Sequence, residues 1–398
     1  MPSPYATHWT LDPAVRFLNH GSFGACPRPV LEAQAELRAR LERHPVRFLQ
    51  RELDPLLDAA REELAAFLKA DPARLAFVGN ATAGVNAVVR SLRFAPGDEL
   101  VTTDHDYNAC RCALAEAAER AGAKVVVARI PFPLTDEQQV FDAVLAVTTA
   151  RTRLVFVDHI TGPTALVFPV KRIIRLLEEL GIDCLVDGTH APGSVPLDLD
   201  GLAPAYYTGN LHKWVCAPKG AGFLYVRPDR QDRVRPAVIS HGENTRRPGR
   251  SHFHDRFDWP GTLDPTAWLS VPAALRFMGG LLPGGWPEIY DTNRDLAISA
   301  RALLAGRLGV PLPAPNTLLA GMATLPLPEV FQRALFSGER IDPLQDRLLD
   351  GHGIEVPVIR WGEPRRRFVR ISAQVYNGTE DYRALGAALV AESTPPGK

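Results

Sequence analysis

Lys213 is the residue of this sequence best suited to covalent chemistry. It lies in the run Asn210–Trp214, which follows two tyrosines at positions 206 and 207 and precedes the apolar Val215. A lysine among aromatic and apolar neighbours is a poor surface residue. Desolvation lowers the pKa of such an amine and makes it a nucleophile that can form a Schiff base. We therefore predict that Lys213 is a reactive amine.

Polar side chains also stand directly after several short apolar runs. After Leu75–Val78 comes a turn of small residues, 79–84, which can hold a phosphate at a helix N-terminus. It matches neither the GxxxxGK[ST] nor the GxGxxG pattern. Polar residues also stand at the ends of three further runs: Asp104-His105-Asp106-Tyr107 and His159–Thr164 follow two of them, and the third ends in Asp187, followed by Gly188-Thr189-His190. A helix cap or an ion pair explains each feature alone, but not their convergence on one lysine.

A repeated strand–helix unit would position these side chains. From about residue 70 to 235, apolar runs of Val, Ile, Leu and Phe alternate with helix-length segments, as in parallel strands buried on both faces. The expected strands are Leu75–Val78, Glu99–Thr103, Lys124–Ile130, Arg153–Asp158, Ile182–Asp187 and Gly222–Val226. The expected helices are Thr82–Leu92, Tyr107–Ala121, Asp136–Ala146 and Val170–Leu180. Ligands bind beyond the carboxyl ends of such strands, which is where the polar residues stand.

The rest of the chain predicts a helical N-terminal part and a smaller C-terminal part. Helices are expected between residues 27 and 69 with a break at Pro45, and again over 265–279 and 286–308. Short strands (Thr317–Leu325, Phe368–Ala373) then alternate with helices (Asp342–Leu349, Glu380–Ala391). We predict an α/β fold with an N-terminal segment 1–70 packing on the small domain, a large domain 71–280 with a mostly parallel sheet, and a small α+β domain 281–398.

Composition and charge exclude several classes of protein. The 398 residues hold 45 Lys and Arg against 45 Asp and Glu, so no basic surface for nucleic acid is expected. Charged residues interrupt every apolar run before the roughly 18 residues that a bilayer requires, which argues against a membrane protein. We expect no signal peptide and, with only five cysteines, no disulfide framework, hence a cytoplasmic protein. Cys110 and Cys112 lack a second pair, so no metal site is expected.

The ordered set of motifs resembles the class V aminotransferases, pyridoxal-phosphate enzymes of fold type I, and within them the isopenicillin N epimerase-like branch. The segments that carry the resemblance are Leu18–Gly24, Asn80–Thr82, Asp104–Tyr107, His159–Thr164, Asp187–Gly193, Asn210–Trp214 and Arg370–Ser372. They span nearly the whole chain in order. The resemblance implies pyridoxal 5′-phosphate as cofactor and a seven-stranded-type sheet between helices.

The resemblance also assigns roles around the cofactor. Lys213 would form its Schiff base, and Asp187 would keep its pyridine nitrogen protonated so that the ring can act as an electron sink. His190 and Thr161 would lie beside the phenolic oxygen. Tyr107, with His105 as its rival, would stack on the ring. The remaining ligands would be Ala81, Thr82, Asn210 and His212, around the phosphate.

Further roles concern the substrate and the assembly. Arg370 would bind the α-carboxylate of an amino-acid substrate through its planar fork, and the substrate side would be lined by Asn19, His20 and Gly21. Thr262 resembles a residue that reaches the phosphate in the neighbouring subunit, which implies a homodimer. The Arg-rich segment 246–256 would either recognise a second acidic group of the substrate or form a solvated loop.

The reaction itself stays open, because one cofactor supports several outcomes. The resemblance implies chemistry at Cα of an amino acid or an amino-acid-derived substrate: epimerisation, transamination or α,β-elimination by a carbon–sulfur lyase. Cysteine desulfurases of this class need a cysteine on a late loop, whereas the last cysteine here is Cys216. A non-catalytic scaffold would not need Lys213, Asp187 and Arg370 together, and a dinucleotide oxidoreductase would need the glycine fingerprint.

Overall fold

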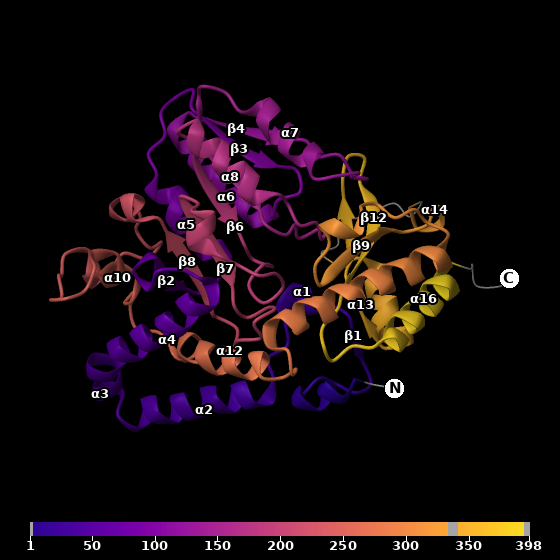
Figure 1. The fold of residues 1–398 in the computed structure, drawn as a ribbon, viewed down its shortest axis with the longest axis horizontal. Coiled ribbons are helices and arrows are strands. Elements are labelled where there is room, and N and C mark those ends of the chain that lie inside the picture. Colours follow the sequence, from indigo (N-terminus) through magenta and orange to yellow (C-terminus); the bar gives the residue numbers. More distant parts are fainter. Residues whose placement is uncertain (1–2, 333–340, 394–398) are drawn as a thin grey trace.

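A seven-stranded sheet forms the centre of the molecule (Figure 1). The computed structural model describes residues 3–332 and 341–393. The strands of this sheet are β2 (Leu75–Val78), β3 (Glu99–Thr103), β4 (Lys124–Ala128), β5 (Thr152–Asp158), β6 (Asp183–Asp187), β7 (Tyr206–Asn210) and β8 (Gly222–Val226). Their order is β2-β8-β7-β6-β5-β3-β4, and β8 is antiparallel to both of its neighbours while the other pairs are parallel. The predicted mostly parallel sheet is confirmed.

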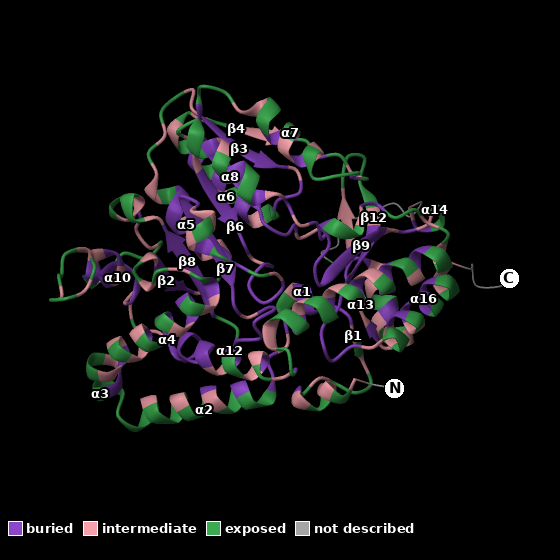
Figure 2. Ribbon diagram, viewed as in Figure 1, coloured by how far each residue is buried: buried purple, intermediate pink, exposed green. Residues whose placement is uncertain are grey.

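Helices cover both faces of this sheet because alternate strand residues bury their side chains on opposite sides. Leu154 and Phe156 of β5 pack with α5 (Ala81–Ser91) and α6 (Asn108–Ala121). Val155 and Val157 pack in the other cluster, with α7 (Gln138–Val147) and α8 (Val170–Glu179). Figure 2 shows the strands buried between these helices, whose outer surfaces are exposed.

The N-terminal residues contact two separate parts of the molecule. The short strand β1 (Arg16–Phe17) pairs in parallel with β10 (Ile354–Glu355) near the C-terminus, and the short helix α1 (His20–Phe23) follows it. Next come α2 (Arg28–Arg43), α3 (Pro45–Arg47), a π-helical turn (Phe48–Glu52) and α4 (Leu53–Leu68). Helices α2 and α4 pack against α11 (Thr266–Leu269) and α12 (Val271–Gly279). The helix expected over 265–279 is therefore two helices, with Pro272 in the first turn of the second.

A second, smaller sheet lies beside the first (Figure 1). It is antiparallel, in the order β11-β12-β9, with β9 (Met322–Pro326), β11 (Val358–Trp361) and β12 (Arg366–Ser372). The helices of this region are α13 (Gly285–Leu308), α14 (Glu329–Gln332), α15 (Pro343–His352) and α16 (Thr379–Ser393), of which α13 packs on β9 and α16. The short helix α9 (Leu199–Leu202) lies between β6 and β7, and the short helix α10 (His252–Phe257) lies between the two sheets along the chain.

Several elements differ from the expectation. The strand expected over Thr317–Leu325 begins only at Met322, because residues 316–318 form a 3-10 turn. Residues 206–210, which carry two tyrosines and an asparagine, form a central strand that the sequence pattern had not predicted. The division into domains at residues 70 and 280 stays a prediction. None of the helices in the described ranges has both the length and the apolar character needed to cross a membrane.

Candidate active site

A cavity of about 1050 Å³ opens at the carboxyl ends of the central strands. Asp158, Asp187 and Asn210 are the last residues of β5, β6 and β7, and all three line it. Lys213 follows β7 by one turn and lines it too. Arg370 of β12 and the turn between β11 and β12 contribute the opposite wall. The cavity thus lies where ligands bind in parallel sheets.

Lys213 is buried, with 9% of its surface exposed. Its Nζ lies 3.5 Å from Nε2 of His190, and its backbone oxygen lies 3.0 Å from Nε2 of His20. Burial, and then the charge of Arg370, lower the pKa of Lys213 to about 7. A large fraction of the amine is therefore neutral, and hence nucleophilic, at neutral pH.

Close backbone packing holds the lysine segment in place. Gly193 adopts a φ of +80°, and a Cβ at this position would lie 2.6 Å from the carbonyl carbon of Trp214. The indole Nε1 of Trp214 donates to Nδ1 of His190 at 3.5 Å. Burial lowers the pKa of His190 well below its ordinary value, and the charges of Lys213 and Arg370 lower it further. His190 is therefore a neutral neighbour of the lysine amine.

Asp187 is an acidic group held by two donors at the end of β6. Only 2% of it is exposed, its Oδ1 accepts the Thr189 N–H at 2.8 Å, and its Oδ2 accepts the thiol of Cys110 at 3.4 Å. Burial raises the pKa of Asp187, whereas these hydrogen bonds and the charge of Lys213 lower it. The arrangement provides a carboxylate inside the cavity that can hold a proton on a basic ring nitrogen.

The N-terminus of α5 faces the same cavity and suits an anion. Asn80 caps this helix by accepting the Ala83 N–H at 2.9 Å, and Asn210 accepts the Ala81 N–H at 2.8 Å. The side chains of Asn80 and Thr82 line the cavity. The helix approaches β7 so closely that a Cβ on Gly84 would lie 2.2 Å from the Thr208 hydroxyl. A phosphate here would meet the positive end of the helix dipole.

Arg370 is a buried cation, and two of its three guanidinium nitrogens donate hydrogen bonds to described residues. Its Nη1 donates to the Gly162 carbonyl and its Nη2 to the Ser22 hydroxyl, while its buried Nε has no hydrogen-bond partner among the described residues. The chain of bonds continues, because Ser22 donates to Asn19, which donates to Glu355 at 2.9 Å. Burial lowers the pKa of Arg370 to about 10, so it stays charged at neutral pH and can bind a carboxylate.

The structure brings together most of the predicted site residues. Those that line the cavity are Gly21, Thr82, Tyr107, Asp187, His190, Asn210, His212, Lys213 and Arg370. Tyr107 is more than half exposed there, whereas its rival His105 is buried and contacts Thr164 and the Ile130 carbonyl. Burial lowers the pKa of His212 to about 4, which leaves a neutral imidazole at the cavity wall.

Five predicted residues do not line the cavity: Asn19, His20, Ala81, Thr161 and Thr262. The Asn19 side chain donates to Glu355, and the Ala81 N–H donates to Asn210. His20 packs behind Lys213 against Trp214, and the centroids of the His20 and Trp214 rings are 5.1 Å apart. The Thr161 hydroxyl bonds to Thr164 at 2.7 Å and accepts the Leu166 N–H at 2.9 Å. Thr262 is exposed.

The cavity also contains residues that the sequence had not singled out. Asp158 carried a usable signal, because it ends an apolar run as Asp187 does. Asp106 was quoted within a motif without a role of its own. Arg111, one turn after Tyr107, carried no local signal. Residues 359–363, which form the end of β11 and the turn after it, carried none either, because they reach the cavity from a separate sheet.

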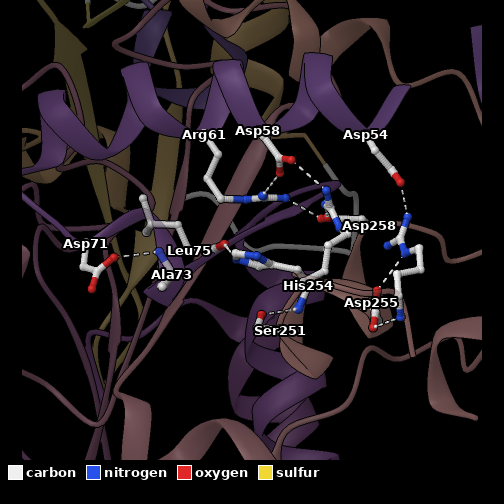
Figure 3. Close-up of polar contacts among 12 residues, drawn as sticks. Asp54, Asp58, Arg61, Asp71, Ala73, Leu75, Ser251, His254, Asp255 and Asp258 are labelled. Carbon is white, nitrogen blue, oxygen red and sulfur yellow. Dashed lines mark hydrogen bonds and ion pairs between the residues drawn. The ribbon is translucent and has the colours of Figure 1, made fainter. Parts of the chain in front are cut away.

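Arg247 and Arg250 of the Arg-rich segment do not line the cavity but form ion pairs, although residues 246, 248 and 249 of the same loop are exposed. Arg247 pairs with Asp54 of α4 and with Asp255, and Arg250 pairs with Asp58 of α4 and with Asp258. Figure 3 shows the acids of α4 above this segment, with Arg61 reaching down to Asp258 at 2.6 Å. Ion pairs thus fix the segment to α4.

Comparisons with known sequences point to one family. The model of the aminotransferase class-V family matches residues 25–385. Isopenicillin N epimerase of Amycolatopsis lactamdurans is 36% identical over 394 residues, which cover 96% of each chain. L-cysteine desulfhydrase of Arabidopsis thaliana is 30% identical over 416 residues, covering 97% of this chain and 89% of the relative.

Solved structures share the fold. The cystine C-S lyase C-DES, in complex with its product cysteine persulfide, superposes with a TM-score of 0.76 at 23% identity and covers 94% of this chain and 96% of its own. The apo cysteine desulfurase of Thermococcus onnurineus NA1 reaches a TM-score of 0.79 at 20% identity, with 98% of both chains covered.

Proposed function

Since the chain belongs to the aminotransferase class-V family, we propose that it moves the proton at Cα of an amino-acid substrate in an epimerase-like reaction. It is a pyridoxal-phosphate-dependent enzyme of fold type I. The observation that carries the proposal is the convergence of Lys213, Asp187 and Arg370 on one cavity of about 1050 Å³. These side chains supply an amine, an acid and a guanidinium in the same enclosed space.

The residues of the cavity fit pyridoxal phosphate chemically. A buried amine with a pKa of about 7 suits its aldehyde, and a buried carboxyl held by two donors suits its pyridine nitrogen. The N-terminus of α5, with Asn80 and Thr82, suits its phosphate. Pyridoxal phosphate supplies the electron sink that makes the Cα proton of a bound amino acid acidic.

Lys213 would take the Cα proton on one face of the substrate, and epimerisation would require a second group to return a proton on the opposite face. A large fraction of the Lys213 amine is neutral at neutral pH, and the neutral imidazole of His190 lies 3.5 Å from it. Asp187 would hold a proton on the pyridine nitrogen. Arg370 would bind the substrate carboxylate, since its Nε has no other hydrogen-bond partner in the described structure. Tyr107 would lie over the cofactor ring.

A carbon–sulfur lyase reaction is the second candidate, and relatives that are L-cysteine desulfhydrases favour it. In that reaction Lys213 removes the Cα proton, the bond between Cβ and sulfur breaks, and the thiolate leaves. Water then releases pyruvate and ammonia. Both reactions start at the same proton, so the candidates differ in what the cavity accepts at Cβ.

Incubation in heavy water tests the proposal. L-amino acids with long acylated side chains and S-substituted cysteines are each mixed with the enzyme, and Cα deuterium, optical rotation, pyruvate and ammonia are followed. Deuterium at Cα with loss of optical purity supports epimerisation, whereas pyruvate with ammonia favours the lyase. No exchange and no product with any substrate would refute both. Lys213→Ala should abolish the covalent attachment of the cofactor to the chain by borohydride. Lys219→Ala is the matched control, because the Lys219 amine donates to the Gly24 carbonyl.

We further propose a homodimer in which Thr262 reaches the site of the second subunit. Its exposure supports this, as does an apolar groove of about 450 Å³ beside it, lined in part by Ala83, Leu263 and Trp268. Sedimentation of the wild-type protein as a monomer would contradict it.

A cytoplasmic location is proposed from the small number of cysteines in the sequence.

A further inference from the structure

Asp158 lines the cavity and has a buried carboxyl oxygen without a hydrogen-bond partner among the described residues. It is the last residue of β5 and is 3% exposed, and the oxygen without a partner is its Oδ1. Strand pairing places it directly beside Asp187, and both side chains line the cavity. A buried polar atom without a partner is costly, so one on a side chain that lines a ligand cavity indicates a contact that a bound ligand would complete.

The two carboxyl groups next to Asp158, those of Asp187 and Asp106, each accept several hydrogen bonds. Asp187 accepts the Thr189 N–H and the Cys110 thiol. Asp106 accepts the Thr102 and Thr103 hydroxyls at 2.6 and 2.9 Å and the backbone N–H groups of Thr103 and Asp158 at 2.6 and 3.2 Å. Donors of this kind stabilise the ionised form.

Asp158 receives much less support in its ionised form. The Gly162 backbone provides a hydrogen bond to it, and Lys213 provides a favourable charge. Burial, and then the charges of Asp106 and Asp187, outweigh both and raise the pKa of Asp158 well above its ordinary value. Carboxyls whose surroundings push their pKa values apart divide the acid and base roles between them.

The phenolic oxygen of the cofactor would lack the hydrogen-bond donor that the resemblance assigned to Thr161. The resemblance assigned its hydroxyl to the phenolic oxygen of the cofactor, yet that hydroxyl binds Thr164 and the Leu166 N–H away from the cavity. Asp158 lies three residues earlier and does line the cavity. We propose that Asp158 is a neutral carboxylic acid that donates a hydrogen bond to the bound cofactor, while Asp187 beside it is the carboxylate. This rests on the proposed function, because it requires pyridoxal phosphate in this cavity.

Two substitutions separate a neutral donor from a charged group. Asp158→Asn keeps a donor of the same shape without a charge, so its affinity for pyridoxal phosphate in equilibrium dialysis should stay within about threefold of the wild type. Asp158→Leu removes the donor and should weaken binding about tenfold. Binding by Asp158→Asn as weak as by Asp158→Leu would overturn the proposal, and so would unchanged binding by Asp158→Leu.

Infrared spectroscopy tests the proton directly and needs neither cofactor nor turnover. The wild-type protein at pH 7 should show the carbonyl stretch of a protonated carboxylic acid that Asp158→Asn lacks. Glu99→Gln is the control, because Arg151 and Thr149 hold the Glu99 carboxylate in its ionised form and the acid band should persist in this variant. A wild-type spectrum identical to that of Asp158→Asn would overturn the proposal even if the protein failed to bind cofactor, which keeps the two failures distinct.

Discussion

Replacing Asp258 should destabilise the protein far more than replacing Asp58, although both acids bind the same two arginines. Asp258 accepts from Arg61 and Arg250 with only 1% of its side chain exposed. Asp58 accepts from the same two cations but is 43% exposed. The comparison keeps the partners constant and varies the burial of the acid.

The expected magnitudes follow from that burial. Asp258→Ala leaves Arg61, whose side chain is 3% exposed, and Arg250 with only the solvent-exposed Asp58 as their shared acid. Breaking a buried ion pair in this way costs about 3 kcal/mol or more. Asp58→Ala removes a solvent-exposed partner while the buried one remains, so its cost should be about 1 kcal/mol or less.

Urea denaturation of the holoenzyme, followed by tryptophan fluorescence and by circular dichroism, measures both variants. Glu63→Ala, which breaks an exposed pair with Arg276, provides the baseline and should cost about 1 kcal/mol or less. Equal losses for Asp258→Ala and Asp58→Ala would refute the reasoning, because the free energy would then not depend on burial. A stable Asp258→Ala variant would mean that water enters the cluster and hydrates Arg61.

Three further outcomes concern the cavity. Because the pKa of Lys213 is lowered to about 7, its amine is neutral above that pH. The rate of pyridoxal phosphate capture in a stopped-flow experiment should therefore be constant above pH 7 and fall about tenfold per pH unit below it. A rate that stays constant down to pH 5 would contradict this. Asp187→Asn should retain cofactor in its absorption spectrum but lose about a hundredfold in kcat; undiminished turnover would remove Asp187 from the proposed role. Arg370→Lys should raise KM about tenfold with kcat changed less than threefold, because a lysine lacks the planar fork; an unchanged KM would place the substrate carboxylate elsewhere.

The sheet was predictable where its strands are uniformly apolar. Leu75–Val78 and Gly222–Val226 have the expected boundaries, because strands buried on both faces contain few polar residues between their turns. Glu99–Thr103 also has the expected boundaries, although three of its five residues are polar. β7 escaped prediction because its polar groups are satisfied by partners distant in the sequence. Tyr207, for example, bonds to His159 at 2.8 Å, and Asn210 bonds to Ala81. Local sequence cannot reveal such partners.

The site was predictable to the extent that residues sit at strand ends. Lys213, Asp187 and Arg370 share the cavity as expected, although their roles stay predictions. Side-chain direction within a turn was not predictable, since the Thr161 hydroxyl turns to Thr164 through a hydrogen bond local to that turn. The ion pairs of the Arg-rich segment were not predictable in full, because two of the acidic partners, Asp54 and Asp58, lie on α4, about 190 residues earlier along the chain.

The hydrogen-bond chain from Arg370 through Ser22 and Asn19 to Glu355 joins the two ends of the polypeptide. During synthesis on the ribosome, the strand that ends at Asp187 and the turn that carries Lys213 emerge long before Arg370 exists. The central sheet can therefore form early, but the anchor for a carboxylate is assembled only when the last tenth of the polypeptide meets the first. A nascent chain stalled before residue 355, or a fragment lacking the first 22 residues, should have a half-built pocket that the missing peptide could restore when added in trans.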